Sequence, residues 1–80
     1  MTEIRLLLVD DHDVVRTGIK MLLESHKDLV IVGEAGDGAQ AIAMSRSLQP
    51  DVIVMDLTLP DISGIEVTRQ LKTESPEQAI

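Results

Sequence analysis

The chain has 80 residues, a formal net charge of −7, and no Cys, Phe, Tyr or Trp. This length supports one small domain with an aliphatic core, and a chain of this size buries only roughly 60% of its unfolded surface. The acidic balance argues against direct nucleic-acid binding by this segment, because such binding normally uses a basic patch. Without cysteines, neither a disulfide framework nor a cysteine-based zinc site is possible.

The sequence shows neither a targeting segment nor a membrane span. Its first residues lack the basic stretch and the apolar run of a signal peptide. No apolar run approaches the roughly 20 residues that cross a bilayer. We therefore expect a cytoplasmic protein without contact to a membrane.

The first predicted element is a strand at residues 4–9, an apolar run interrupted only by Arg5. Such a run is typical of a strand that is covered on both faces, as in a parallel sheet. Asp13 is expected to cap the following helix by accepting hydrogen bonds from its first amides. Arg16 on this helix is expected to face solvent. The apolar stripe of the helix is made of Val15, Ile19, Leu22 and Leu23.

The rest of the chain continues this alternation. We expect strands at residues 29–32 and 52–55, helices at 39–48 and 65–73, and a loop at 33–38. Ala79 and Ile80 are expected to begin a further strand. The alternation indicates an α/β domain of β-α-β-α-β-α order, with a parallel sheet and right-handed crossovers. Residues 1–80 form one domain in this interpretation, and nothing marks a second one.

Three carboxylates follow two of the predicted strands. Asp10 and Asp11 come directly after the first strand, and Asp56 follows the third. The carboxyl ends of parallel strands lie at one edge of the sheet, where α/β proteins place their chemistry. Crowded carboxylates repel one another unless a cation neutralises them or one takes up a proton. Their oxygens suit Mg²⁺, which also shields a phosphoryl group from a carboxylate nucleophile. A magnesium site explains three such acids better than helix caps or solvated turns do.

Residues 36–41, with the sequence GDGAQA, allow a competing interpretation as a dinucleotide-binding turn. However, the pattern follows the second strand rather than the first, and Asp37 would place a negative charge beside a pyrophosphate. A turn that uses glycine for a positive φ before a helix explains the pattern more simply. His12 is expected to be an exposed loop residue.

The stretches LLLVDDHDVVRTGIKMLL, VIVGEAGDGAQAI and PDVIVMDLTLPDISGIEV resemble the receiver domain of bacterial two-component response regulators. DDH followed by VVRTG, and VGEAGDG, are most similar to the LuxR-type (NarL/FixJ-like) subgroup. The resemblance covers nearly the whole chain and implies a flavodoxin-like (CheY-like) fold. It also implies a switch module rather than an enzyme in the usual sense. Such a module is phosphorylated by a histidine kinase and controls transcription through a C-terminal helix-turn-helix domain that binds DNA.

The same resemblance implies roles for individual residues. Asp56 would accept the phosphoryl group and, with the other acids, hold Mg²⁺. Asp11 would be a direct ligand of the metal, and Asp10 would support it directly or through water. The backbone carbonyl of Thr58 would be a further ligand. The loop beyond it would be shaped by Pro60 and Gly64.

Compared with a complete receiver, whose strand order is 2-1-3-4-5, this chain would lack strands 4 and 5 and helices 4 and 5. The hydroxyl and the lysine that sense the phosphoryl group in this family would be absent as well. The edge of the third strand and apolar surface beside the first helix would be bare, and such surfaces recruit other chains. We therefore expect self-association, as a dimer or a swapped oligomer. An alternative function is an interaction piece that is not phosphorylated.

Overall fold

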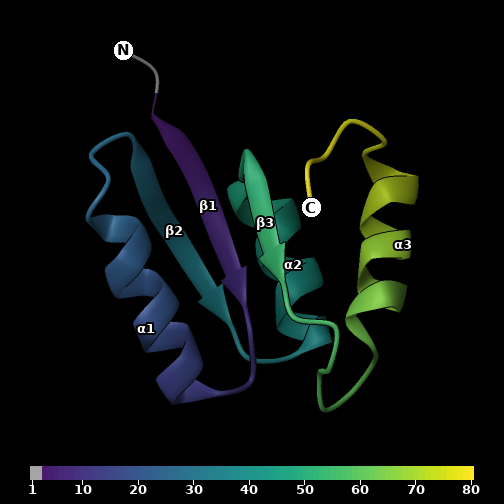
Figure 1. Ribbon diagram of the computed structural model, residues 1–80. Coiled ribbons are helices and arrows are strands. Elements are labelled where there is room, and N and C mark those ends of the chain that lie inside the picture. Colours follow the sequence, from purple (N-terminus) through teal and green to yellow (C-terminus); the bar gives the residue numbers. More distant parts are fainter. Residues whose placement is uncertain (1–2) are drawn as a thin grey trace.

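The computed structural model describes residues 3–80, and it confirms the predicted alternation of strands and helices. All three strands are parallel, and their order in the sheet is β2-β1-β3 (Figure 1). Helices α2 and α3 lie against each other on one face of the sheet, and α1 lies on the other (Figure 1). The elements are β1 (Ile4–Val9), α1 (Asp13–Glu24), β2 (Leu29–Ala35), α2 (Gly38–Leu48), β3 (Val52–Met55) and α3 (Gly64–Glu74).

The core lies between the sheet and the pair α2 and α3, and it is aliphatic as expected. Alternate side chains of a strand point to the same face, so one set from β1 and β3 enters this layer. The small side chain of Ala41 packs against that set, and so do Val67 and Leu71 of α3. The buried cluster consists of Leu7, Val9, Ala35, Ala41, Ile53, Val67 and Leu71.

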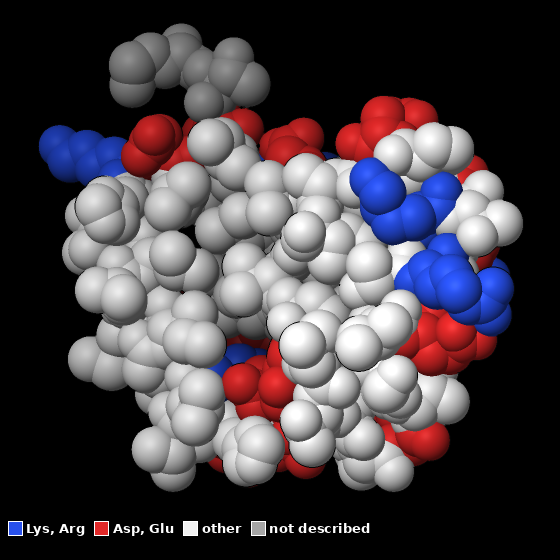
Figure 2. Space-filling view, turned by 45° about the vertical axis from the view of Figure 1, so that its right-hand side comes forward, with Lys and Arg blue, Asp and Glu red and all other residues white. Residues whose placement is uncertain are grey.

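The opposite face of the sheet is covered less completely. No side chain of α1, all of whose residues are described, is fully buried, and Val15 and Leu22 from its predicted stripe are 47% and 68% exposed. Only Ile19 and Leu23 are half-buried, so the stripe is confirmed in part. Val54 on β3 is also 36% exposed. Figure 2 shows uncharged surface across the middle of the visible face, with charged residues at its margins.

Strand β2 is longer than predicted, because residues 33–35 belong to it and not to the loop. Its pairing with β1 shifts register where Leu6 lies opposite Ile31 and Leu7 lies opposite Gly33. A Cβ on Gly33 would come within 2.7 Å of the Leu48 side chain. This glycine therefore permits close packing of α2 on the sheet. No glycine among residues 3–80 has a positive φ, so the expected glycine turn before α2 was also wrong.

The helix starts differ in how they are capped. Asp13 is the first residue of α1 rather than its cap, and its carboxylate pairs with Arg16 at 2.8 Å. Asp37 caps α2 by accepting from the Gln40 amide, and Ser63 caps α3. The prediction for Asp13 was wrong because the chain enters α1 one residue earlier.

Arg5 on β1 explains the one charge in the first apolar run. Its guanidinium donates to the carbonyl oxygens of Leu48 and Gln49, both at 2.8 Å, at the end of α2. The Arg5 amide donates to the Asp51 carboxylate, and the Asp51 amide, just before β3, donates to the Arg5 carbonyl. A cation at this pole of a helix is favourable, since the last carbonyls lack partners in the helix.

The last residues lie along the outer edge of β3. Ala79 forms a parallel bridge with Val52, and the Ile53 amide donates to the Ala79 carbonyl at 3.0 Å. This agrees with the expectation that a further strand begins here. Within residues 3–80, no helix is long and apolar enough to cross a membrane.

Candidate functional site

The three predicted carboxylates meet at the carboxyl ends of β1 and β3. Hydrogen bonding continues just past both strands, because the Asp56 amide donates to the Val9 carbonyl at 2.9 Å. The Asp10 amide likewise donates to β2 at 3.0 Å, at the Ala35 carbonyl. Ligand atoms of Asp10, Asp11, His12 and Asp56 lie within 4.8 Å of one another. The sheet therefore brings together the acids that the sequence singled out.

His12 is part of this cluster, although the sequence indicated only an exposed loop residue. The residue is exposed, but its Nδ1 lies 2.9 Å from a carboxylate oxygen of Asp10, 3.0 Å from Asp11 and 3.8 Å from Asp56. The hydrogen bond with Asp10, and then the charge of Asp11, raise the pKa of the imidazole above its ordinary value. When it is protonated, the ring supplies positive charge among the acids.

The donor set fits Mg²⁺. Asp10, Asp11 and Asp56 offer only oxygen ligands, which this hard cation prefers, and all three are partly open to the water that completes its shell. The position of the His12 nitrogen shows that the three carboxylates already face one point. Bound there, the cation would be held by Asp10, Asp11 and Asp56.

The loop after Asp56 is held close to this carboxylate. The Thr58 amide donates to Asp56 Oδ1 at 3.1 Å, and the Gly64 amide donates to the Leu57 carbonyl at 2.9 Å. A Cβ on Gly64 would collide with the Asp56 carbonyl oxygen, so only glycine fits here. The close approach of the Asp56 carbonyl explains a glycine at this position, and its loop-shaping role stays a prediction. Pro60 is exposed, and its role and that of the Thr58 carbonyl stay predictions.

Arg16 was expected in solvent but reaches the site. Its side chain is only 20% exposed and donates to the backbone carbonyl of Asp10. It also pairs with Glu34 at the end of β2, at 3.1 Å, and Lys20 pairs with the same carboxylate at 3.2 Å. The spacing from Asp13 to Arg16 was the available signal, because residues three apart are neighbours on a helix.

Asp61 is a second residue that the sequence did not single out. Its carboxylate accepts from the amides of Gly38 and Ala39 at 2.7 and 2.9 Å, at the start of α2. These bonds, first the one from Gly38, hold the pKa of the Asp61 carboxyl below its ordinary value. No local pattern reveals this contact, since 23 residues separate Asp61 from Gly38.

The backbone amides that a dinucleotide would need at residues 36–41 already donate to side chains of the protein. A pyrophosphate at such a turn would need the free amides of the helix N-terminus. Here Asp61 accepts from the first two amides of α2, and Asp37 accepts from the amide of Gln40. Two carboxylates thus occupy the place of a phosphate.

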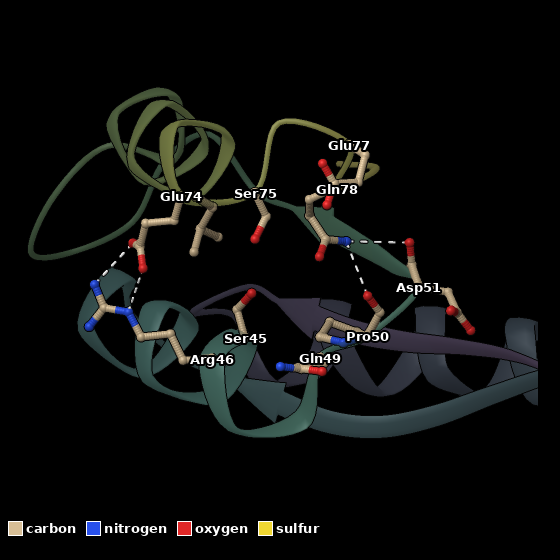
Figure 3. A pocket seen from close by; sticks show the side chains of 10 residues that line it. Ser45, Arg46, Gln49, Pro50, Asp51, Glu74, Ser75, Glu77 and Gln78 are labelled. Carbon is tan, nitrogen blue, oxygen red and sulfur yellow. Dashed lines mark hydrogen bonds and ion pairs between the residues drawn. The ribbon is translucent and has the colours of Figure 1, made fainter.

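A hollow of about 640 Å³ lies at the other end of the sheet, away from the acid cluster. Figure 3 shows its polar lining, with Arg46 paired to Glu74 and the Gln78 amide group bonded to the Pro50 and Asp51 carbonyls. Three acids line the hollow, but within residues 3–80 the group close enough together to hold a metal ion is the one at Asp10, Asp11, His12 and Asp56. Asp51 at the rim of the hollow precedes β3, whereas Asp56 follows it. The lining residues are Ser45, Arg46, Gln49, Pro50, Asp51, Leu71, Glu74, Ser75, Glu77 and Gln78. The chemistry indicated by the sequence belongs to the acid cluster.

Several known proteins are similar to this chain. VraR, a response regulator protein of Staphylococcus aureus, is 45% identical over 74 residues, which cover 92% of this chain and 35% of VraR. A LuxR-family two-component response regulator from Aurantimonas sp. SI85-9A1 has a TM-score of 0.89 and 41% identity, over 94% of this chain and 54% of that one. RcsB from Salmonella enterica serovar Typhimurium, solved bound to the promoter rprA with the phosphomimetic BeF₃⁻, has a TM-score of 0.87 and 29% identity, over 95% and 39%.

The chain thus spans about a third of the length of VraR. The chain matches the response regulator receiver domain family. Its sheet order β2-β1-β3 agrees with the order of these strands in the flavodoxin-like fold. Because the match extends over residues 6–80, this chain belongs to the receiver domains of two-component response regulators.

Proposed function

We propose that Asp56 accepts a phosphoryl group from a histidine kinase in a reaction that depends on Mg²⁺. The observation that supports this most directly is the position of the Asp56 carboxylate. It lies at the end of β3, is held by the Thr58 amide at 3.1 Å, and is 25% exposed beside two further acids. A carboxylate placed in this way is accessible to a phosphorus atom.

In the transfer step, an Asp56 oxygen forms a bond to phosphorus while the bond from phosphorus to the kinase histidine nitrogen breaks. The leaving nitrogen keeps the electron pair. Asp10 and Asp11 would hold the cation, which when bound would neutralise charge on the phosphoryl oxygens. The hydrogen bond from Thr58 keeps the attacking carboxylate oriented. Arg16 fixes the Asp10 backbone from α1, so the acids keep their places.

This role makes the chain a phosphoacceptor and not an enzyme in the usual sense, because each molecule is itself modified. RcsB, which binds a promoter, supports the proposal that the output of this protein is transcription regulation through a separate DNA-binding domain. With a net charge of −7, the described segment itself is unsuited to bind DNA. A receiver that meets a kinase inside the cell would be cytoplasmic.

The test is incubation with acetyl phosphate and Mg²⁺, followed by intact-mass measurement. We expect one added phosphoryl group per chain, no label after removal of the metal with EDTA, and no label in Asp56→Asn. Label that persists in folded Asp56→Asn would assign the acceptor role to another residue. An unlabelled but folded wild type would contradict phosphoryl acceptance altogether.

A second candidate function, self-association, is favoured by the sparsely covered sheet face. Val14, Met21 and Leu22 on α1 are 86%, 69% and 68% exposed. Along the outer edge of β3, the described residues contribute a single bridge, between Val52 and Ala79. We propose that a second copy of the chain pairs through this face, because both an apolar patch and an open strand edge promote association.

A further inference from the structure

The start of α2 is held by two carboxylates that belong to different parts of the chain. Asp37 is the local cap and accepts from the Gln40 amide at 2.7 Å. Asp61, on the β3–α3 loop, accepts from Gly38 at 2.7 Å through Oδ1 and from Ala39 at 2.9 Å through Oδ2. Both acids satisfy amides that have no partner within the helix. Only Asp61 connects the helix to the loop that carries the phosphoacceptor.

The side chains around this contact are closely packed, and this packing fixes the position of the loop on α2. A Cβ on Gly38 would come within 2.5 Å of the Ile62 side chain and 2.9 Å of Val67. Ile62 directly follows Asp61, and its amide donates to Asp61 Oδ1 at 2.9 Å. The lack of a side chain at Gly38 thus lets the tip of the loop lie directly on the helix end.

The same loop is held a second time near its base. The Gly64 amide donates to the Leu57 carbonyl at 2.9 Å, and a Cβ at Gly64 would come within 2.7 Å of the Leu57 Cα. Thr58 lies between this base and Asp61, and its amide is bonded to the Asp56 carboxylate at 3.1 Å. The segment that carries the Thr58 carbonyl is therefore short and held at both ends.

We propose that Asp61 is a positioning residue for metal binding, because its carboxylate holds the loop whose Thr58 carbonyl the receiver family implies as a ligand. This inference rests on the proposed function. Asp61 itself touches neither the metal nor the phosphoryl group. Its loss frees the tip of the loop, so the Thr58 carbonyl is no longer held in one orientation relative to the acids. Groups that orient a metal ligand from behind typically change metal affinity by about 10- to 100-fold when they are removed.

The test compares three variants of the protein. Asp61→Ala removes both bonds to α2, and Asp61→Asn retains one oxygen as acceptor. Asp37→Ala is the matched control, because it removes a cap of the same helix at 2.7 Å without touching the loop. Circular dichroism checks the fold of each variant, and hydrogen exchange of the Gly38 and Ala39 amides reports the link itself without metal.

The decisive quantity is the Mg²⁺ concentration at half-saturation, measured by NMR shifts of the Asp11 and Thr58 amides in the unphosphorylated protein. We expect Asp61→Ala to raise it about 10-fold, at the lower end of the range for such groups. Asp61→Asn should fall between Asp61→Ala and the wild type, and Asp37→Ala should leave the half-saturation unchanged. The rate of labelling by acetyl phosphate should recover in Asp61→Ala at high Mg²⁺.

An unchanged half-saturation in folded Asp61→Ala would overturn the inference, and so would an equal increase in Asp37→Ala, because a frayed helix would then explain both. If Asp61→Ala does not fold, Asp61→Asn decides by the same criterion. The metal titration does not require phosphorylation. A wild type that binds Mg²⁺ but is never labelled would therefore contradict the proposed function and leave the positioning role standing.

Discussion

At the scale of the residue, the site is defined by charges that meet at the ends of strands. His12 Nδ1 lies within 3.0 Å of both Asp10 and Asp11, and the raised pKa of its imidazole favours the protonated ring. A magnesium ion would use the same carboxylate oxygens. The imidazole nitrogen therefore lies where the cation would bind, so the ring would have to move aside when the metal binds.

A prediction at this scale concerns the ionisation of Asp61. Bonds from the Gly38 and Ala39 amides lower its pKa from the ordinary value of 3.8. Because the folded value lies below the unfolded one, the ionised carboxylate stabilises the fold fully above pH 3.8. This contribution is lost as the pH falls through the folded value. We expect NMR titration of the side-chain carboxyl to give a midpoint below 3.8.

In the same experiment, the amide shifts of Gly38 and Ala39 should follow the titration of Asp61. The variant Asp61→Asn serves as the control, because it keeps the shape of the side chain and has no charge to lose. Its amides should show no such step. A midpoint at or above 3.8 in the wild type would contradict an effective link between the loop and α2.

At the scale of the element, α2 is held at both ends by distant residues. Asp61 binds its first amides, and Arg5 of β1 donates to the carbonyls of Leu48 and Gln49 at its end. Gln49 adopts a left-handed conformation with a φ of 48°, which ends the helix. Since α2 packs on the sheet through small side chains such as Ala41, these end contacts fix its position along the strands.

A prediction at this scale is that Arg5→Met lowers the free energy of unfolding. Methionine keeps much of the apolar stem but donates no hydrogen bond, so two carbonyls at the end of α2 lose a charged partner. One of these bonds is exposed and the other is part-buried. We expect a loss of about 1–2 kcal/mol, at the lower end for bonds to charged groups, measured by urea denaturation.

The matched control is Arg69→Met on α3. Among residues 3–80, the Arg69 side chain pairs with Glu66 alone, three residues earlier on the same helix, and it is 68% exposed. Exposed pairs of this kind contribute little to stability, so we expect a smaller loss than in Arg5→Met. Equal losses in the two variants would show that the contact of Arg5 with α2 adds nothing beyond a surface charge.

At the scale of the whole molecule, the two faces of the sheet differ in how they are covered. Helices α2 and α3 close one face over a buried aliphatic cluster (Figure 1). On the other face, α1 alone lies on the sheet, and Leu22 and Val54 remain 68% and 36% exposed. An apolar surface of this kind promotes association with a second copy.

The corresponding prediction is that the 80-residue chain self-associates through the α1 face. Sedimentation velocity over a range of concentrations should show a reversible increase in mean mass. Leu22→Glu should shift this increase to higher concentration, because it places a charge in the proposed contact. Ile65→Glu should leave it unchanged, since Ile65 is equally exposed, at 66%, but lies on α3. A monomer at every concentration would contradict the proposal.

Much of the fold could be predicted because its causes are local. Apolar runs specified β1 and β3 with their bounds, and the alternation of strands and helices specified the parallel sheet. The length of β2 was missed, because Gly33 reads as a loop residue until its contact with Leu48 is known. The start of α1 was missed by one residue, because Asp13 can act either as a cap or as a first-turn acid.

The sequence alone determined that Asp10, Asp11 and Asp56 follow two apolar strands, and parallel strands then bring them to one edge. Only the tertiary structure decided which other side chains join them. His12 and Arg16 turn toward the acids, and Asp61 reaches α2 across 23 residues. The physical reason is that strand and helix periods are set by near neighbours, whereas these contacts depend on how finished elements pack against each other.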